Sequence, residues 1–120
     1  DMLRYELSPN GAFNIPEFGT VQDSLQFTAM YAYSPYHHVR AGTPYPAILF
    51  LTGANDARVD PLHSRKMTAR LQAAGAPAVW LRTSATSGHG GGTALDEQIE
   101  QEVDVYSFLF DALRVPVGSH

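Results

Sequence analysis

The chain contains two short apolar runs, each followed by a polar loop and then a helical pattern, and this alternation constrains its fold more than any other feature. The runs are "AILFLT" at residues 47–52 and "PAVWLRT" at residues 77–83. A continuous apolar run between turn residues is typical of a strand buried on both faces of a parallel sheet. The order from residue 46 onward therefore predicts an α/β fold, with a parallel sheet flanked by helices. Two strands alone do not make a stable sheet.

Two helices are predicted after the two loops. In residues 61–75, Pro61 suits the first helical position, an apolar side recurs, and Gly75 can end the helix. In residues 94–114, apolar residues recur at steps of three and four, which is a strong helical signal. They are Leu95, Ile99, Val103, Tyr106, Phe110 and Leu113.

The first 46 residues are less regular. Residues 6–22 are rich in Pro, Gly and Asn and are predicted to be a loop. Asp23 can cap a helix over residues 24–33, in which Leu25, Ala29 and Ala32 share a face.

Composition excludes several classes of protein. A formal net charge of −4 without a basic stripe argues against nucleic-acid binding. No apolar run approaches the roughly 20 residues of a membrane helix, and no signal peptide is visible, so we expect no membrane partner. The chain has no cysteine, which excludes thiolate zinc sites and a Cys nucleophile but does not fix the compartment. We expect a cytoplasmic or periplasmic location.

The two loops carry the residues of chemical interest. Asp56 follows the first apolar run in "GANDARVD", and His89 follows the second in "TSATSGHGGGT". Ligands and chemistry in α/β sheets lie beyond the carboxyl ends of the strands, and neighbouring strands are about 4.8 Å apart. The two side chains could therefore meet. A carboxylate that accepts a hydrogen bond from a histidine fixes its tautomer, which is the Asp–His half of a Ser-His-Asp system.

Each of these residues also has a simpler interpretation. Asp56 can merely close an Asx turn, His89 can be a solvated loop residue, and Arg58 can belong to a surface ion pair. The glycine-rich loop could bind an anion, but it lacks the Lys-Ser/Thr ending of a P-loop. The catalytic interpretation is favoured because the residues stand in the right order at two strand ends. No metal site is predicted, since the adjacent His37 and His38 make a poor ligand pair.

A nucleophile is missing from this scheme. The α/β-hydrolase fold places its serine in G-x-S-x-G, and no serine here has those flanking glycines. The chain order in that fold is Ser, acid, His, so the nucleophile should precede Asp1. The chain also starts without Met, and we expect it to begin inside a larger protein. The serine would then belong to a missing N-terminal region or to a companion chain.

Several stretches together resemble the C-terminal end of the prolyl oligopeptidase family of serine peptidases. They are "DMLRY", "EFG", "YSPYHHV", "PAILFLTGANDARVDPLHSRKM", "GHGGGT" and "DVYSFLF", and they cover nearly the whole chain. The resemblance implies that residues 1–120 are the C-terminal segment of an α/β-hydrolase catalytic domain. The part with the nucleophile and the family's β-propeller would lie outside this chain.

The resemblance also assigns roles to single residues. Asp56 corresponds to the triad acid and His89 to the triad base. Arg58 corresponds to the arginine that holds a substrate backbone carbonyl, and Val59 to a residue of the primary specificity pocket. Prolyl-specific members carry a Trp four residues before the Tyr of an "[E/D]-Y-G" motif.

That motif is altered in this chain. Phe18 takes the place of the Tyr, and Asn14 takes the place of the Trp, so a preference for proline is not implied. The predicted function is peptide-bond hydrolysis without metal or cofactor. An esterase with the same triad and a non-catalytic docking module are the alternatives.

Because the chain contains no nucleophile elbow, we expect the isolated chain to be inactive. Incubation with a fluorophosphonate probe should label no serine, since loss of a triad serine costs about a million-fold in turnover. Stoichiometric labelling of any serine would contradict this expectation.

Overall fold

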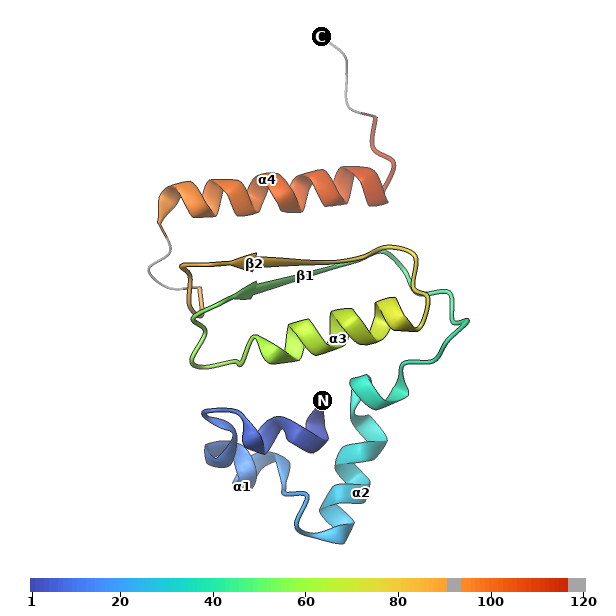
Figure 1. The fold of residues 1–120 in the computed structure, drawn as a ribbon, viewed down its shortest axis with the longest axis vertical. Coiled ribbons are helices and arrows are strands. Elements are labelled where there is room, and N and C mark those ends of the chain that lie inside the picture. The colour runs from blue at the N-terminus through green and yellow to red at the C-terminus, as the bar shows by residue number, and fades with distance from the viewer. Residues whose placement is uncertain (91–93, 117–120) are drawn as a thin grey trace.

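The protein is arranged in layers. The structure, a computed structural model, describes residues 1–90 and 94–116. Figure 1 shows helix α4 (Leu95–Ala112) on one face of a two-stranded sheet and helix α3 (Leu62–Ala73) on the other. Beyond α3 lies an N-terminal segment of short helices, residues 1–38. No helix within the described residues is long and apolar enough to cross a membrane.

The sheet confirms the predicted parallel arrangement. Strands β1 (Ile48–Gly53) and β2 (Val79–Ser84) pair in parallel, with Gly53 opposite Ser84 at their carboxyl ends. Helix α3 connects them, as parallel pairing requires. Both predicted strands are present, with ends shifted by one or two residues. The backbone therefore leaves both strands at the same level of the sheet, which is where the two polar loops begin.

Helix α3 packs against the sheet through a small apolar core. Val39, Leu71 and Val79 are buried there, and Leu71 is only 1% exposed. Burying a leucine side chain stabilises a fold by about 1.5–3 kcal/mol. The amide of Leu62 donates to Asp60 Oδ1 at 2.8 Å and fixes the start of the helix, so Pro61 precedes the helix instead of opening it. At the other end, Gln72 Nε2 donates to Val79 O at 2.9 Å.

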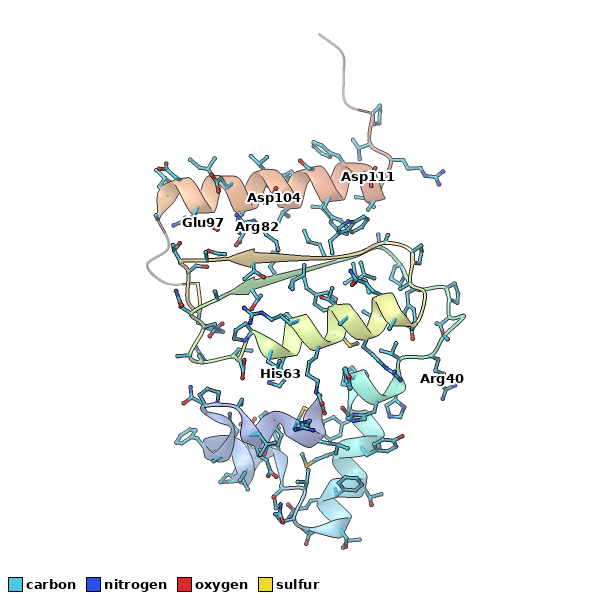
Figure 2. The ribbon with its side chains drawn as sticks, in the orientation of Figure 1. Arg40, His63, Arg82, Glu97, Asp104 and Asp111 are labelled. Atoms are coloured by element: carbon cyan, nitrogen blue, oxygen red, sulfur yellow. The ribbon has the colours of Figure 1, made fainter. Side chains whose placement is uncertain are left out.

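Both polar and aromatic side chains tie helix α4 to the sheet. Figure 2 shows Arg82 on β2 between the strand and the helix, close to Glu97 and Asp104. Its guanidinium donates to Asp104 Oδ2 at 2.7 Å and to Glu97 Oε1 at 2.8 Å. The hydrogen bond to Asp104, with that to Glu97, raises the pKa of Arg82 above its ordinary value against the effect of burial. Trp80 and Phe108 add an edge-on ring contact with centroids 5.7 Å apart.

The apolar stripe of α4 remains open to solvent. The helix confirms the predicted periodicity, yet its repeating apolar residues are between 44% and 69% exposed. They are Leu95, Ile99, Val103, Tyr106, Phe110 and Leu113. Leu51 of β1 is also 42% exposed, so the expected burial of this strand on both faces does not occur within this chain. The stripe stays open because Glu97 and Asp104, on the opposite side of α4, face the sheet.

The N-terminal segment corrects the prediction of a loop over residues 6–22. It contains the 3₁₀ helices η1 (Met2–Leu7) and η2 (Gly11–Asn14) and the single turn α1 (Ile15–Phe18). Pro16 fits the first turn of a helix, and turns this short have no apolar repeat to reveal them. Tyr5 holds the segment together, because its hydroxyl donates to Gly19 O at 2.5 Å.

Helix α2 (Ser24–Tyr33) confirms the predicted cap. Asp23 Oδ1 accepts the amides of Leu25 at 3.0 Å and Gln26 at 2.9 Å. The face shared by Leu25, Ala29 and Ala32 points to solvent, however, and Leu25 is 80% exposed. Met30, at 1% exposure, provides the buried contact instead. The 3₁₀ helix η3 (Pro35–His38) follows.

Two polar contacts attach the N-terminal segment to the layer above it. Lys66 on α3 forms an ion pair with Asp1, whose side chain is only 3% exposed. Asn10 donates its side-chain amide to Ala57 O in the loop after β1. The second contact places the segment directly beneath that loop.

Because the sheet has two strands and the stripe of α4 is uncovered, we expect the isolated chain to be only marginally stable. Its backbone amides, including those of residues 47–51, should exchange rapidly with solvent in hydrogen-exchange measurements. Strong protection of these amides in a sample of monomeric mass would contradict the expectation.

Candidate active site

The loop after β1, residues 54–60 and here called the acid loop, holds Asp56 in a defined orientation. Asp56 Oδ1 accepts the backbone amide of Arg58 at 2.9 Å and that of Val59 at 2.8 Å. The amide of Asp56 itself donates to Gly53 O at 3.3 Å. Asp56 therefore does close an Asx turn, as its simpler interpretation proposed, but this turn occupies only one of its two oxygens.

The second oxygen of Asp56 faces His89. His89 Nδ1 and Asp56 Oδ2 are 2.9 Å apart. An ionised carboxylate can only accept, so Nδ1 carries a proton; in the neutral ring, Nε2 is then the acceptor. The Asp56 side chain is 10% exposed and the His89 side chain 46% exposed. The pair thus combines a shielded carboxylate with an imidazole that solvent or another group can approach.

The surroundings of Asp56 favour its ionised form. Burial acts to raise the pKa of this carboxyl, but three hydrogen bonds act in the opposite direction. They come from the Val59 amide, the His89 ring and the Arg58 amide, and together they hold the pKa of Asp56 below its ordinary value. Asp56 is therefore a permanent negative charge beside the imidazole at neutral pH.

The loop after β2, residues 85–90 and here called the histidine loop, is bonded to the acid loop. The last rung of the strand pairing runs from Ala54 N to Ser84 O at 2.8 Å. Asn55 then makes two further bonds, from its backbone amide to Ser87 O and from Nδ2 to Ala85 O, both 3.2 Å long. The two loops continue the contact of the strands past the point where the sheet ends.

Gly53 permits this close approach. A Cβ atom at this position would lie 2.4 Å from Ser87 O and 2.6 Å from Gly88 O, both of them backbone atoms. Any other residue would push the histidine loop away from the acid loop. The sequence did not predict roles for Gly53 and Asn55. A glycine at the carboxyl end of an apolar strand was a signal for Gly53, and nothing in the sequence pointed to Asn55.

A hollow of about 580 Å³ opens beside the pair. Asp56, His89 and the predicted pocket residue Val59 all line it, and Val59 is 48% exposed. Leu51, Gly53, Asp60, Ser64, Ser87 and Glu102 are among its other lining residues. The hollow gives another group room to approach the imidazole.

The remaining predicted residues lie outside this hollow. Arg58 is exposed on the acid loop, two residues after Asp56. Asn14 donates to Asn10 O at 3.4 Å, and Asn10 in turn donates to Ala57 O, so Asn14 is linked to the acid loop through one residue. Phe18 packs edge-on against Tyr5 within the N-terminal segment, with ring centroids 5.6 Å apart.

His37 and His38 have partners of their own, away from Asp56. His37 Nδ1 lies 2.8 Å from Ser34 Oγ, and His38 Nε2 lies 2.9 Å from Tyr31 O. Across residues 1–90 and 94–116, no group of three or more His, Cys, Asp or Glu side chains is placed to hold a metal ion. Residues 91–93 of the predicted glycine-rich loop lie outside the described residues.

Parallel strands between helices, with Asp56 and His89 beyond the ends of neighbouring strands, define the α/β-hydrolase class of fold. Residues 1–115 match the sequence model of the prolyl oligopeptidase family. The chain belongs to the prolyl oligopeptidase family, which is a family of peptidases.

Sequence relatives agree with this assignment. The chain is 40% identical over 111 residues to the prolyl endopeptidase of Elizabethkingia miricola, covering 90% of this chain and 16% of that protein. It is 39% identical over 114 residues to prolyl oligopeptidase ophP of Omphalotus olearius, covering 91% and 15% respectively. The chain thus spans about one sixth of the length of these relatives.

Solved structures of prolyl oligopeptidases are also similar to nearly the whole of this chain. One comes from a structural and mechanistic study of two prolyl endopeptidases, with 47% identity and a TM-score of 0.89 over 97% of this chain and 17% of that one. Another is prolyl oligopeptidase B of Galerina marginata bound to a 35mer hydrolysis and macrocyclization substrate. It is 29% identical, with a TM-score of 0.87 over 99% of this chain and 17% of that one.

We expect the Asp56 carboxyl to titrate below its ordinary value of 3.8 in the folded protein. A carboxyl whose pKa is lower when folded stabilises the fold above its unfolded pKa, and this contribution is lost as the pH falls through the folded value. His89→Ala removes one of the three hydrogen bonds and should raise the pKa of Asp56, as followed by NMR of its carboxyl carbon. A pKa of Asp56 that His89→Ala leaves unchanged would show that the pair does not interact.

Proposed function

We propose that this chain supplies the acid and the general base of a Ser-His-Asp triad in a serine peptidase that hydrolyses peptide bonds. One observation carries the proposal: His89 Nδ1 lies 2.9 Å from Asp56 Oδ2, at the ends of two neighbouring parallel strands. This distance is within the range for a base and the group that orients it.

The chemistry follows from the protonation states of the pair. His89 Nε2 accepts the proton of a serine hydroxyl as its oxygen attacks the peptide carbonyl, and the ring becomes an imidazolium. Asp56 stabilises that positive charge. Because it holds Nδ1, it also keeps Nε2 directed toward the serine. The imidazolium then gives its proton to the departing amine, and the acyl group remains bound to the serine as an acyl-enzyme. A water molecule, deprotonated by His89 in the same way, hydrolyses the acyl-enzyme and regenerates the serine.

The serine itself would come from outside residues 1–120. We propose that these residues are the C-terminal segment of a catalytic domain, and that the nucleophile lies on a preceding region or a companion chain, with any β-propeller likewise outside. The relatives are about six times longer than the matched region, which supports this division. The Galerina enzyme has been solved with substrate in forms that carry a serine, a histidine or an aspartate replaced by alanine. These are the three residue types of the proposed triad.

Substrate contacts are assigned to the acid loop and the N-terminal segment. Arg58 is exposed, and its guanidinium can donate two hydrogen bonds to a substrate backbone carbonyl. Val59 lines the hollow beside His89 and would form part of the primary pocket. Asn14 and Phe18 would contribute from the segment beneath. Asn14 cannot stack on a substrate proline as a tryptophan ring does, so no preference for proline is proposed.

A hybrid enzyme tests the proposed roles of the pair. In it, residues 1–115 of this chain replace the matching segment of the Elizabethkingia miricola prolyl endopeptidase. The hybrid should cleave peptides. His89→Ala should abolish turnover, and Asp56→Asn should lower kcat about ten-thousand-fold because the amide imposes the wrong tautomer on the ring.

Further measurements on the hybrid separate the alternatives. His38→Ala changes an exposed histidine outside the hollow and should leave kcat unchanged. Cleavage of small esters but not of peptide amides would favour an esterase. A folded hybrid that cleaves neither would favour a docking module. Arg58→Ala should weaken peptide cleavage more than cleavage of a small ester that does not reach the guanidinium.

A further inference from the structure

The pairing of Asp56 with His89 depends on the spacing of two loops that have left the sheet. His89 is 46% exposed, and Asp56 lies on the other loop. A displacement of about 1 Å in a catalytic group can cost a hundred-fold in rate. Some contact must therefore hold the two loops in register beyond the last rung of the strand pairing.

Among the described residues, Asn55 makes such a contact. It stands immediately before Asp56 and donates twice to the histidine loop, from its backbone amide to Ser87 O and from Nδ2 to Ala85 O. Two donors on one residue, aimed at carbonyls two positions apart, fix both the distance and the direction of the histidine loop. The side-chain bond acts as an additional rung, although Asn55 itself is exposed to solvent.

Gly53 allows the two loops to approach closely, and Asn55 fixes their alignment. The space above Gly53 allows Ser87 O to approach within 2.4 Å of where a Cβ would lie, which brings the carbonyls of the histidine loop into reach. The hydrogen bonds of Asn55 then determine which carbonyl meets which donor. The position of His89, two residues after Ser87, follows from this alignment.

We propose that Asn55 is a positioning residue that aligns His89 with Asp56 through its side-chain amide, without itself touching substrate. The proposal rests on the proposed function of the pair. It assigns to Asn55 an effect on the chemical step, which a residue that only stabilises the fold would not have.

Gln72 provides a matched control for this claim. Its side-chain amide also donates to a backbone carbonyl of the second strand, Val79 O at 2.9 Å, but at the opposite end of β2 from the histidine loop. The two bonds are of the same chemical kind and similar length. Each amide can be replaced by an uncharged side chain of nearly the same shape, in Asn55→Leu and Gln72→Met.

The experiment compares these variants in the hybrid enzyme. Asn55→Leu should lower kcat about ten- to a hundred-fold with little change in KM, since the chemical step is misaligned and binding is not. The NMR signal of the His89 Nδ1 proton should weaken or shift. Asn55→His restores a ring N–H donor near the position of Nδ2 and should recover most of kcat. Gln72→Met should leave kcat and the His89 signal unchanged, whatever its effect on the melting temperature.

The outcomes separate this proposal from the function on which it rests. An unchanged kcat and His89 signal in Asn55→Leu would overturn the role of Asn55, as would an equal loss of kcat in Gln72→Met. If Asp56→Asn had no effect on kcat, the proposed function would fail instead. The His89 Nδ1 signal would then still report whether Asn55 aligns the pair, because it requires no turnover. If Asn55→Leu unfolds the hybrid, Asn55→Ser is compared with Gln72→Met in its place.

Discussion

The parallel pairing of β1 with β2 is the interaction on which the rest of the site depends. Its register sets Gly53 opposite Ser84, so the loops after β1 and β2 begin side by side, at the spacing of neighbouring strands, about 4.8 Å. Asp56 follows three residues after the end of one strand, and His89 follows five residues after the end of the other. A shift of one residue in this register would turn alternate side chains to the opposite face and separate the loops. The 2.9 Å contact between Asp56 and His89 thus depends first on the sheet, which brings the two loops side by side.

Much of this arrangement could be predicted from sequence, for identifiable reasons. Continuous apolar runs predict buried strands, a three-to-four residue repeat predicts the long helix, and their order predicts parallel pairing. The candidate pair followed from the position of polar loops at strand ends. The contributions of Gly53 and Asn55 did not, since they depend on where the backbone carbonyls of another loop come to lie. The short helices of the N-terminal segment were missed because a single turn is too brief to show periodicity.

Helix α4 illustrates a different limit. The repeat of Leu95, Ile99 and Val103 predicts that one side of the helix is apolar, but periodicity does not say what that side will meet. In the structure the opposite side faces the sheet, where Arg82 bridges Glu97 and Asp104. An ion-paired network fixes the position of a helix well but contributes less to stability than apolar burial, because the charges lose hydration when they pair. The chain spans about one sixth of the length of its relatives, and the buried core of its described residues is small.

The two oxygens of Asp56 have different functions, one in the shape of the acid loop and one in the contact with His89. Oδ1 accepts two backbone amides and shapes the acid loop, while Oδ2 faces the imidazole. An asparagine at this position can keep its carbonyl oxygen on the amides of Arg58 and Val59, so the turn is preserved. Its NH₂ group then faces Nδ1 and can only donate, which forces the imidazole to carry its proton on Nε2. An alanine would remove both interactions at once and loosen the loop as well. The asparagine substitution therefore isolates the tautomer of His89 from the shape of the loop, since it alters the one oxygen that the fold does not need.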